Sequence, residues 1–174
     1  MNRVVVAALL VLWATAIFAG SVAGQSIALR DLAGNRVYLD SLLAKGPVVL
    51  NFWATWCKPC RIEIPHLERI YREFSPKGVQ FGAVSIDTRR DKKRVEQFIE
   101  DAKLSLPVYR DTQAIVAKKF KVAAIPTTVI LDRSGAVHYS ARWYRRGDEI
   151  ILRKQIEAVL RSKGEGEGDT QGTQ

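Results

Sequence analysis

The chain has 174 residues, a net charge of +9 and two cysteines. This length supports one domain with its own core. Cysteines three positions apart close too small a loop to hold a fold together, which excludes a disulfide-stapled scaffold. Basic runs such as 89–94 and 142–146 are more typical of a solvated face than of a phosphate-tracking surface, so no nucleic-acid partner is predicted.

The first 23 residues have the pattern of a secretory signal. An apolar run from Val4 to Phe18 follows a basic residue, and small residues at Ser21 and Ala23 suit cleavage by signal peptidase. Residues 4–23 also match the roughly 20 residues that an uncleaved membrane anchor requires. Both interpretations place the rest of the chain in the periplasm or at the outer face of the cytoplasmic membrane.

The elements that follow alternate between strands and helices. In order, we predict a hairpin of strands 27–30 and 36–39, a helical turn at 40–44, a buried strand at 48–53, a helix from the cysteines to Phe74, a strand at 79–86, a helix at 91–102, an extended segment at 106–109, a brief helix capped by Asp111 or Thr112, a hairpin of strands 127–131 and 136–143, and a final helix capped by Asp148. Residues 164–174 contain no apolar side chain and are expected to be a disordered tail, which leaves a domain at 24–163.

The two cysteines stand at the start of the first long helix. Cys57 and Cys60 follow the buried strand 48–53 directly. At a helix N-terminus the free N–H groups and the macrodipole favour a negative charge, so a thiol there ionises readily and becomes a nucleophile. A second thiol one turn on can resolve the mixed disulfide. The pattern predicts disulfide exchange through a Cys57–Cys60 redox pair, with no other cofactor.

Several motifs together resemble a known family. Phe52-Trp-Ala-Thr-Trp-Cys57-Lys-Pro-Cys60, with Glu63 and Pro65 after it and Ile125-Pro126-Thr127-Thr128 further on, resembles the thioredoxin superfamily and, within it, the extracytoplasmic TlpA/ResA/CcmG-like thiol-disulfide oxidoreductases. The resemblance covers roughly residues 27–161. It implies an α/β thioredoxin-like fold, with a central mixed sheet flanked by helices, an N-terminal β-hairpin and an inserted helix at 91–102.

The resemblance also implies roles for single residues. Cys57 would be the exposed attacking sulfur and Cys60 the resolving one. Glu63, one turn after Cys60, would adjust the acidity of the pair and relay protons, although an exposed helical glutamate is the plainer alternative. Asn51 stands where thioredoxins have a buried aspartate, and asparagine cannot accept a proton. The proton would therefore pass to Glu63 or to water.

The family's cis-proline matches Pro126, which is expected to face the cysteines. The backbone of Ile125 would then pair with an extended stretch of the partner protein. The predicted substrate groove consists of Trp56, Lys58, Pro59, Ile125 and Thr127. Lys58 either helps a thiolate to form or is merely solvated.

Rival functions use the same cysteines. A zinc site needs further ligands, and His66 and His138 are poorly placed for one, so no metal site is predicted. Copper delivery, a thiol peroxidase, and a binding module that holds extended polypeptide remain alternatives.

The expected partners follow from the resemblance. They are protein thiols and disulfides, with apocytochrome c as one candidate client, and a membrane thiol reductant of the CcdA/DsbD type. Pro59 favours a reductant, because strongly oxidising relatives tend to have histidine before the second cysteine. A monomer is favoured.

Overall fold

The computed structural model describes residues 27–162. Its centre is a five-stranded mixed sheet with the strand order β5-β4-β3-β6-β7. The strands are β3 (Val48–Trp53), β4 (Gln80–Ser85), β5 (Val108–Arg110), β6 (Thr127–Leu131) and β7 (Val137–Arg142). β3 pairs parallel with β4 and antiparallel with β6. This arrangement confirms the predicted thioredoxin-like mixed sheet.

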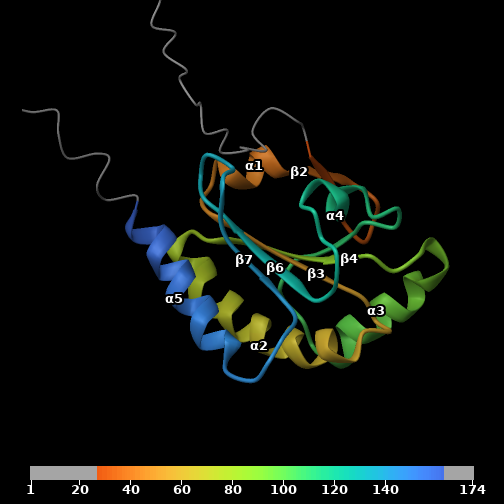
Figure 1. Ribbon diagram of the computed structural model, residues 1–174. Helices are drawn as coiled ribbons and strands as arrows, with labels where there is room; N and C mark the ends of the chain where they lie inside the picture. The colour runs from red at the N-terminus through yellow and green to blue at the C-terminus, as the bar shows by residue number, and fades with distance from the viewer. Residues whose placement is uncertain (1–26, 163–174) are drawn as a thin grey trace, which may run out of the picture.

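Helices cover both faces of this sheet. The helices are α1 (Leu39–Leu43), α2 (Lys58–Phe74), α3 (Lys92–Asp101), α4 (Ile115–Lys119) and α5 (Asp148–Arg161), with short 3-10 turns η1 (Ser75–Lys77) and η2 (Arg89–Asp91). In Figure 1, α2, α3 and α5 lie below the sheet, while α1, α4 and the hairpin of β1 (Ala28–Arg30) and β2 (Arg36–Tyr38) lie above it. All six residues of β3 are buried because this strand has neighbours on both edges and both faces.

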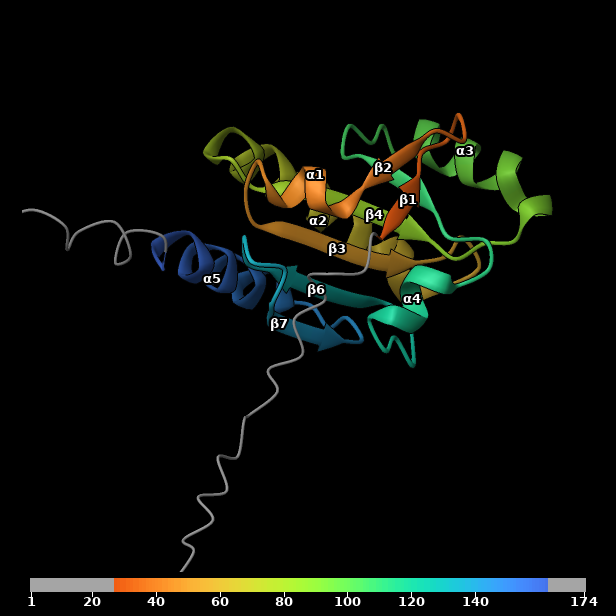
Figure 2. The same cartoon turned by 90° about the horizontal axis from the view of Figure 1, so that it is seen from above.

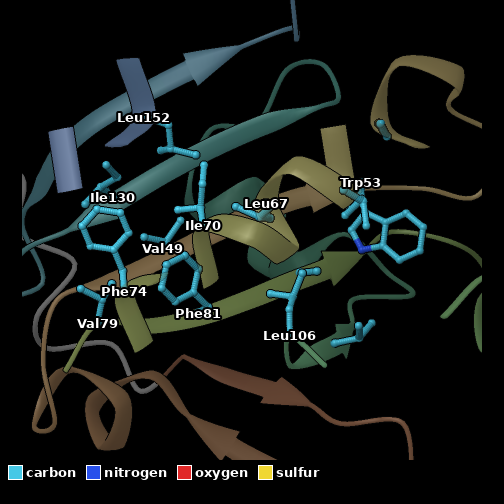
Figure 3. Packing of buried hydrophobic residues seen from close by; sticks show 14 of the residues in the cluster. Val49, Trp53, Leu67, Ile70, Phe74, Val79, Phe81, Leu106, Ile130 and Leu152 are labelled. Atoms are coloured by element: carbon cyan, nitrogen blue, oxygen red, sulfur yellow. The ribbon is translucent and has the colours of Figure 1, made fainter. Parts of the chain in front are cut away.

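Two apolar cores result, one on each face. In the core between α2 and the sheet, Ile70 and Phe74 lie among Val49, Phe81 and Ile130 (Figure 3). The helical period of α2 brings these side chains onto one stripe. The second core lies between the sheet and the elements above it, and includes Leu29, Leu39, Leu50 and Leu131. Figure 2 shows the hairpin and α1 lying over β3 and β4.

The strand ends are aligned at one edge of the sheet. β3, β4 and β5 run parallel, with Trp53 beside Ser85 and Ser85 beside Arg110. The segments that leave these three strands therefore lie next to one another at one edge of the sheet. This is the edge at which parallel sheets bind ligands. The hairpin is joined to β5 by a bridge between Asp31 and Tyr109.

Within residues 27–162, no helix is long and apolar enough to cross a membrane. The predicted signal or anchor at 1–23 and the predicted tail at 164–174 lie outside the described residues.

Candidate active site

Cys57 and Cys60 form a disulfide at the N-terminus of α2, with their Cα atoms 5.3 Å apart. Cys57 is the N-cap residue, and its Sγ accepts a hydrogen bond of 3.3 Å from the backbone N–H of Cys60. Pro59 lies in the first turn, where a backbone amide would lack a helical partner in any case. A thiolate on Cys57 would be stabilised by the same N–H group and by the helix dipole.

Cys57 is more buried than predicted. It keeps 5% of its surface exposed, whereas Cys60 keeps none. Cys57 packs into the core cluster that also contains Trp53 and Ala54, and this packing makes it less exposed than the sequence predicts. The order of exposure still matches the predicted roles, because Cys57 is the one cysteine of the pair that solvent reaches.

A buried aspartate holds the loop in front of the cysteines. Asp87 accepts hydrogen bonds from the backbone N–H of Thr55 at 2.9 Å and from its hydroxyl at 2.7 Å. Ser85, the last residue of β4, donates a third bond of 2.9 Å. The end of β4 therefore fixes the position of the segment that leads into Cys57. Sequence reasoning missed this network, since Thr55 and Asp87 lie 32 positions apart.

Glu63 is buried in a polar network three residues after Cys60. Its Oε2 accepts a bond of 2.9 Å from Asn51 Nδ2, and its Oε1 accepts one of 3.1 Å from Thr128 Oγ1. Asn51 Nδ2 also donates to Thr128 Oγ1 at 2.9 Å. The network therefore joins β3, α2 and β6, and Glu63 is not the exposed glutamate of the plainer alternative. Thr128 was not singled out as its partner from the sequence.

Burial raises the pKa of Glu63 to about 7. The hydrogen bonds from Asn51 and Thr128 oppose this shift, while the charge of Asp148 adds to it. Both hydrogen-bond donors are neutral, so they compensate only part of the cost of burying a charge. A carboxyl group with this pKa exchanges its proton near neutral pH, which suits an acid-base group.

A small cavity lies next to Glu63. Its volume is about 20 Å³, room for one water, and its lining includes His66, Tyr144 and Glu149. The hydroxyl of Tyr144 donates to Glu149 at 3.0 Å, and His66 Nδ1 lies 3.5 Å from the same carboxylate. Polar groups of α2, α5 and the segment between β7 and α5 therefore border the buried acid.

The Ile125–Pro126 peptide bond is cis, as the sequence predicts. The carbonyl oxygen of Pro126 accepts a hydrogen bond of 2.8 Å from the N–H of Trp143. Within the described part of the chain, neither backbone group of Ile125 takes part in a hydrogen bond.

The predicted groove residues differ in their exposure. Trp56 is 63% exposed, Lys58 and Pro59 are exposed, and Ile125 is half-buried. Thr127 is buried, and its hydroxyl donates to the carbonyl of Ala124 at 2.6 Å. The first four residues thus have solvent-exposed side-chain surface, whereas the hydroxyl of Thr127 is bonded within the turn before β6.

Among residues 27–162, no group of three or more histidine, cysteine, aspartate or glutamate side chains is placed to hold a metal ion. His66 lies 2.8 Å from Arg69 and stacks at an angle on Tyr144, and His138 is exposed on β7.

The AhpC/TSA family model matches residues 22–140. The chain belongs to the AhpC/TSA family. Within this family it is homologous to thiol-disulfide oxidoreductases ResA. The protein of Geobacillus kaustophilus is 38% identical over 123 residues, which are 71% of this chain and 68% of the relative. That of Bacillus subtilis is 37% identical over 109 residues, 63% of this chain and 59% of the relative.

A similar solved structure is that of a candidate thiol:disulfide interchange protein DsbE from Chlorobium tepidum. It has a TM-score of 0.71 and 29% identity, and the match covers 78% of this chain and 94% of that one. These likenesses confirm the predicted family and enzyme class, thiol-disulfide oxidoreductase.

Proposed function

We propose that this AhpC/TSA-family protein reduces disulfides of other proteins outside the cytoplasm. The observation that carries the proposal is the position of the Cys57–Cys60 disulfide on a helix N-terminus, with the buried acid Glu63 one turn away. The first feature favours a thiolate, and the second supplies a group that takes up a proton near neutral pH.

In the first step, the thiolate of Cys57 attacks one sulfur of the partner's disulfide. A mixed disulfide forms, and the other partner sulfur leaves as a thiolate that takes a proton from water. In the second step, Cys60 loses its proton and attacks the sulfur of Cys57. The Cys57–Cys60 disulfide forms, and the second partner sulfur leaves as a thiolate that takes a proton from water. The partner gains two electrons, and the protein is oxidised by two.

Glu63 is the proposed acceptor of the Cys60 proton. It follows Cys60 by three positions on α2, so it is one turn away on the same helix. Asn51 holds its carboxylate but cannot take a proton itself. The Glu63 proton then passes to solvent, for which the adjoining water-sized cavity gives room.

The partner docks beside Pro126. Because neither backbone group of Ile125 is used within the described residues, an extended partner chain can add hydrogen bonds there. Trp56, the residue before Cys57, offers exposed apolar surface. The remaining parts of the proposal rest on the family: location in the periplasm or at the outer membrane face, re-reduction by a membrane thiol reductant of the CcdA/DsbD type, and apocytochrome c as a client.

Two measurements test this function. Equilibration with a glutathione buffer is expected to give a potential more negative than about −180 mV, and a value near −120 mV, that of a strong oxidant, would contradict a reductant. A Cys60→Ser variant is expected to accumulate mixed disulfides with its clients in cells, whereas a Cys57→Ser variant is the matched control that accumulates none. Equal capture by both variants would refute the assigned order of attack.

A further inference from the structure

A groove of about 770 Å³ lies at the sheet edge that follows β4 and β5. It is bordered by the β1–β2 hairpin, by the start of α3 and by the segment that leads into α4. Figure 1 shows α4 next to this hairpin. The charged residues of its lining are Arg30, Arg36, Arg89, Lys92 and Arg110, against Asp31 and Asp111. We call this the basic groove.

Of the five cations of the basic groove, Lys92 pairs with Glu96 at 3.4 Å, and the charge of Arg110 acts on nearby Asp91. Arg30 donates to the carbonyl of Gly34, and Arg110 donates to the carbonyls of Thr88 and Arg89. Across residues 27–162, none of the four arginines forms an ion pair. Arg110 Nε is buried and lacks an acceptor there. The guanidinium of Arg110 donates only to backbone carbonyls among the described residues, so its charge is available to attract a carboxylate bound in the groove.

The two acids of the groove are already occupied. Asp31 accepts bonds from the backbone and side chain of Asn35. Asp111 accepts bonds from the N–H groups of Ile115 and Ala117 at the start of α4. These neutral donors do not cancel the charges of the two carboxylates, but the five cationic side chains outnumber them and leave the lining net positive.

The basic groove and the loop that leads to Cys57 lie at the same edge of the sheet. Trp53, Ser85 and Arg110 stand side by side on neighbouring strands, so the ends of β3 and β5 are about 10 Å apart. The bonds from Thr55 to Asp87 join the cysteine loop to the segment that leads into Arg89. An extended chain covers about 10 Å in roughly three residues.

We propose that the basic groove binds an acidic segment of the partner protein, a few residues away from the disulfide that Cys57 attacks. This inference rests on the proposed function and names a charge preference for its substrate. The cations come from four separate elements, β1, β2, η2 and β5, with Lys92 at the start of α3. Cations spread over several elements can pair with several carboxylates along a peptide chain better than with one compact anion.

The test compares two disulfide-linked peptides that differ only beside the disulfide. One has glutamates three to six positions away, and the other has glutamines there. The wild-type protein is expected to reduce the acidic peptide about tenfold faster in kcat/KM at low salt, with the preference shrinking as salt is added. Equal rates for both peptides would overturn the proposal.

The decisive variant is Arg36→Glu/Arg89→Glu, because both side chains are exposed and their replacement should not disturb the core. It is expected to abolish the preference for the acidic peptide. The matched control is Lys45→Glu/Lys154→Glu, which changes the net charge equally at exposed positions outside the groove, before β3 and on α5. Loss of the preference in the control as well would show a general charge effect and refute a specific groove.

Binding is measured separately from chemistry with the same peptides carrying serine in place of cysteine. The oxidised wild-type protein is expected to bind the acidic version about tenfold more tightly than the neutral version. Binding without this difference would overturn the groove assignment even if both disulfide peptides are reduced. If neither disulfide peptide is reduced while the acidic serine peptide still binds selectively, the proposed reductase function fails and the groove stands.

Discussion

Two glutamates on α2, five residues apart, are both buried, yet their surroundings differ in kind. Within residues 27–162, Glu63 accepts hydrogen bonds only from the neutral groups of Asn51 and Thr128. Burial dominates there and raises its pKa to about 7. Glu68 also loses solvation, but donors from Ser105, Arg72 and Leu106 outweigh that cost and lower its pKa.

The difference separates a chemical role from a structural one. Glu68 binds the backbone N–H groups of Ser105 and Leu106 and the guanidinium of Arg72, so it joins α2 to the segment that precedes β5 as a permanent anion. Glu63 lacks a cationic partner among the described residues and is nearly balanced between its two protonation states at neutral pH. Of the two glutamates, only Glu63 has surroundings that allow it to exchange a proton during turnover.

The largest expected effect is on the pH dependence of stability. The folded pKa of Glu63 lies above its unfolded value, so the fold favours the protonated form and loses stability as pH rises from about 4.5 through 7. A Glu63→Gln variant should gain about 3 kcal/mol relative to the wild type between pH 4 and pH 8. Urea unfolding of the oxidised wild type and variant at both pH values measures this difference in stability. The same pH dependence in both proteins would contradict the raised pKa of Glu63.

The next effect is on rate. Glu63→Gln removes the proposed proton acceptor and should slow disulfide reduction at pH 7 about a hundredfold. Glu68→Gln is the matched control on the same helix, with little change in rate per folded molecule. Stopped-flow fluorescence of the reaction with a protein disulfide separates them. A slow Glu68→Gln variant beside a fast Glu63→Gln variant would reverse the assigned roles.

A smaller effect is expected on the stability of the control. Glu68→Gln leaves backbone donors facing an uncharged amide, so the free energy of unfolding at pH 7 should fall by about 2 kcal/mol. The lowered pKa of Glu68 also means that its contribution is present at neutral pH and is lost as pH falls. Chemical denaturation at pH 7 and in acid tests both statements, and a variant as stable as the wild type at pH 7 would contradict them.

The smallest effect concerns Tyr144, which borders the cavity next to Glu63. Its hydroxyl donates to Glu149 and not to Glu63. Tyr144→Phe should therefore cost about 1 kcal/mol of stability and leave the pH midpoint of the rate in place. A moved midpoint would show that the tyrosine acts on the buried acid directly.

Much of this architecture is local and could be predicted from the sequence. The apolar run at 48–53 predicts a buried strand, and the cysteine motif with Pro59 marks the start of a helix, because both signals lie within a few residues. The hairpin at 27–39 is likewise predicted from residues close together in the sequence. Each of these predictions is confirmed by the described structure.

The rest depends on residues that only folding brings together. Asn51 and Thr128 are 77 positions apart, and their contact with Glu63 decides whether that glutamate is exposed or buried. The burial of Cys57 comes from side-chain packing, which a motif does not encode. The basic groove draws its cations from five elements, so no single charged run in the sequence indicates it.

The most direct test of the account is a titration of the side-chain carboxyl carbons of Glu63 and Glu68 by NMR, with the Cys57–Cys60 disulfide intact. We expect Glu63 to titrate near pH 7, whereas the lowered pKa of Glu68 places its titration below that of an ordinary glutamate. If both groups titrate in the acid range, or if their order is reversed, Glu63 is not the proton acceptor of the disulfide exchange.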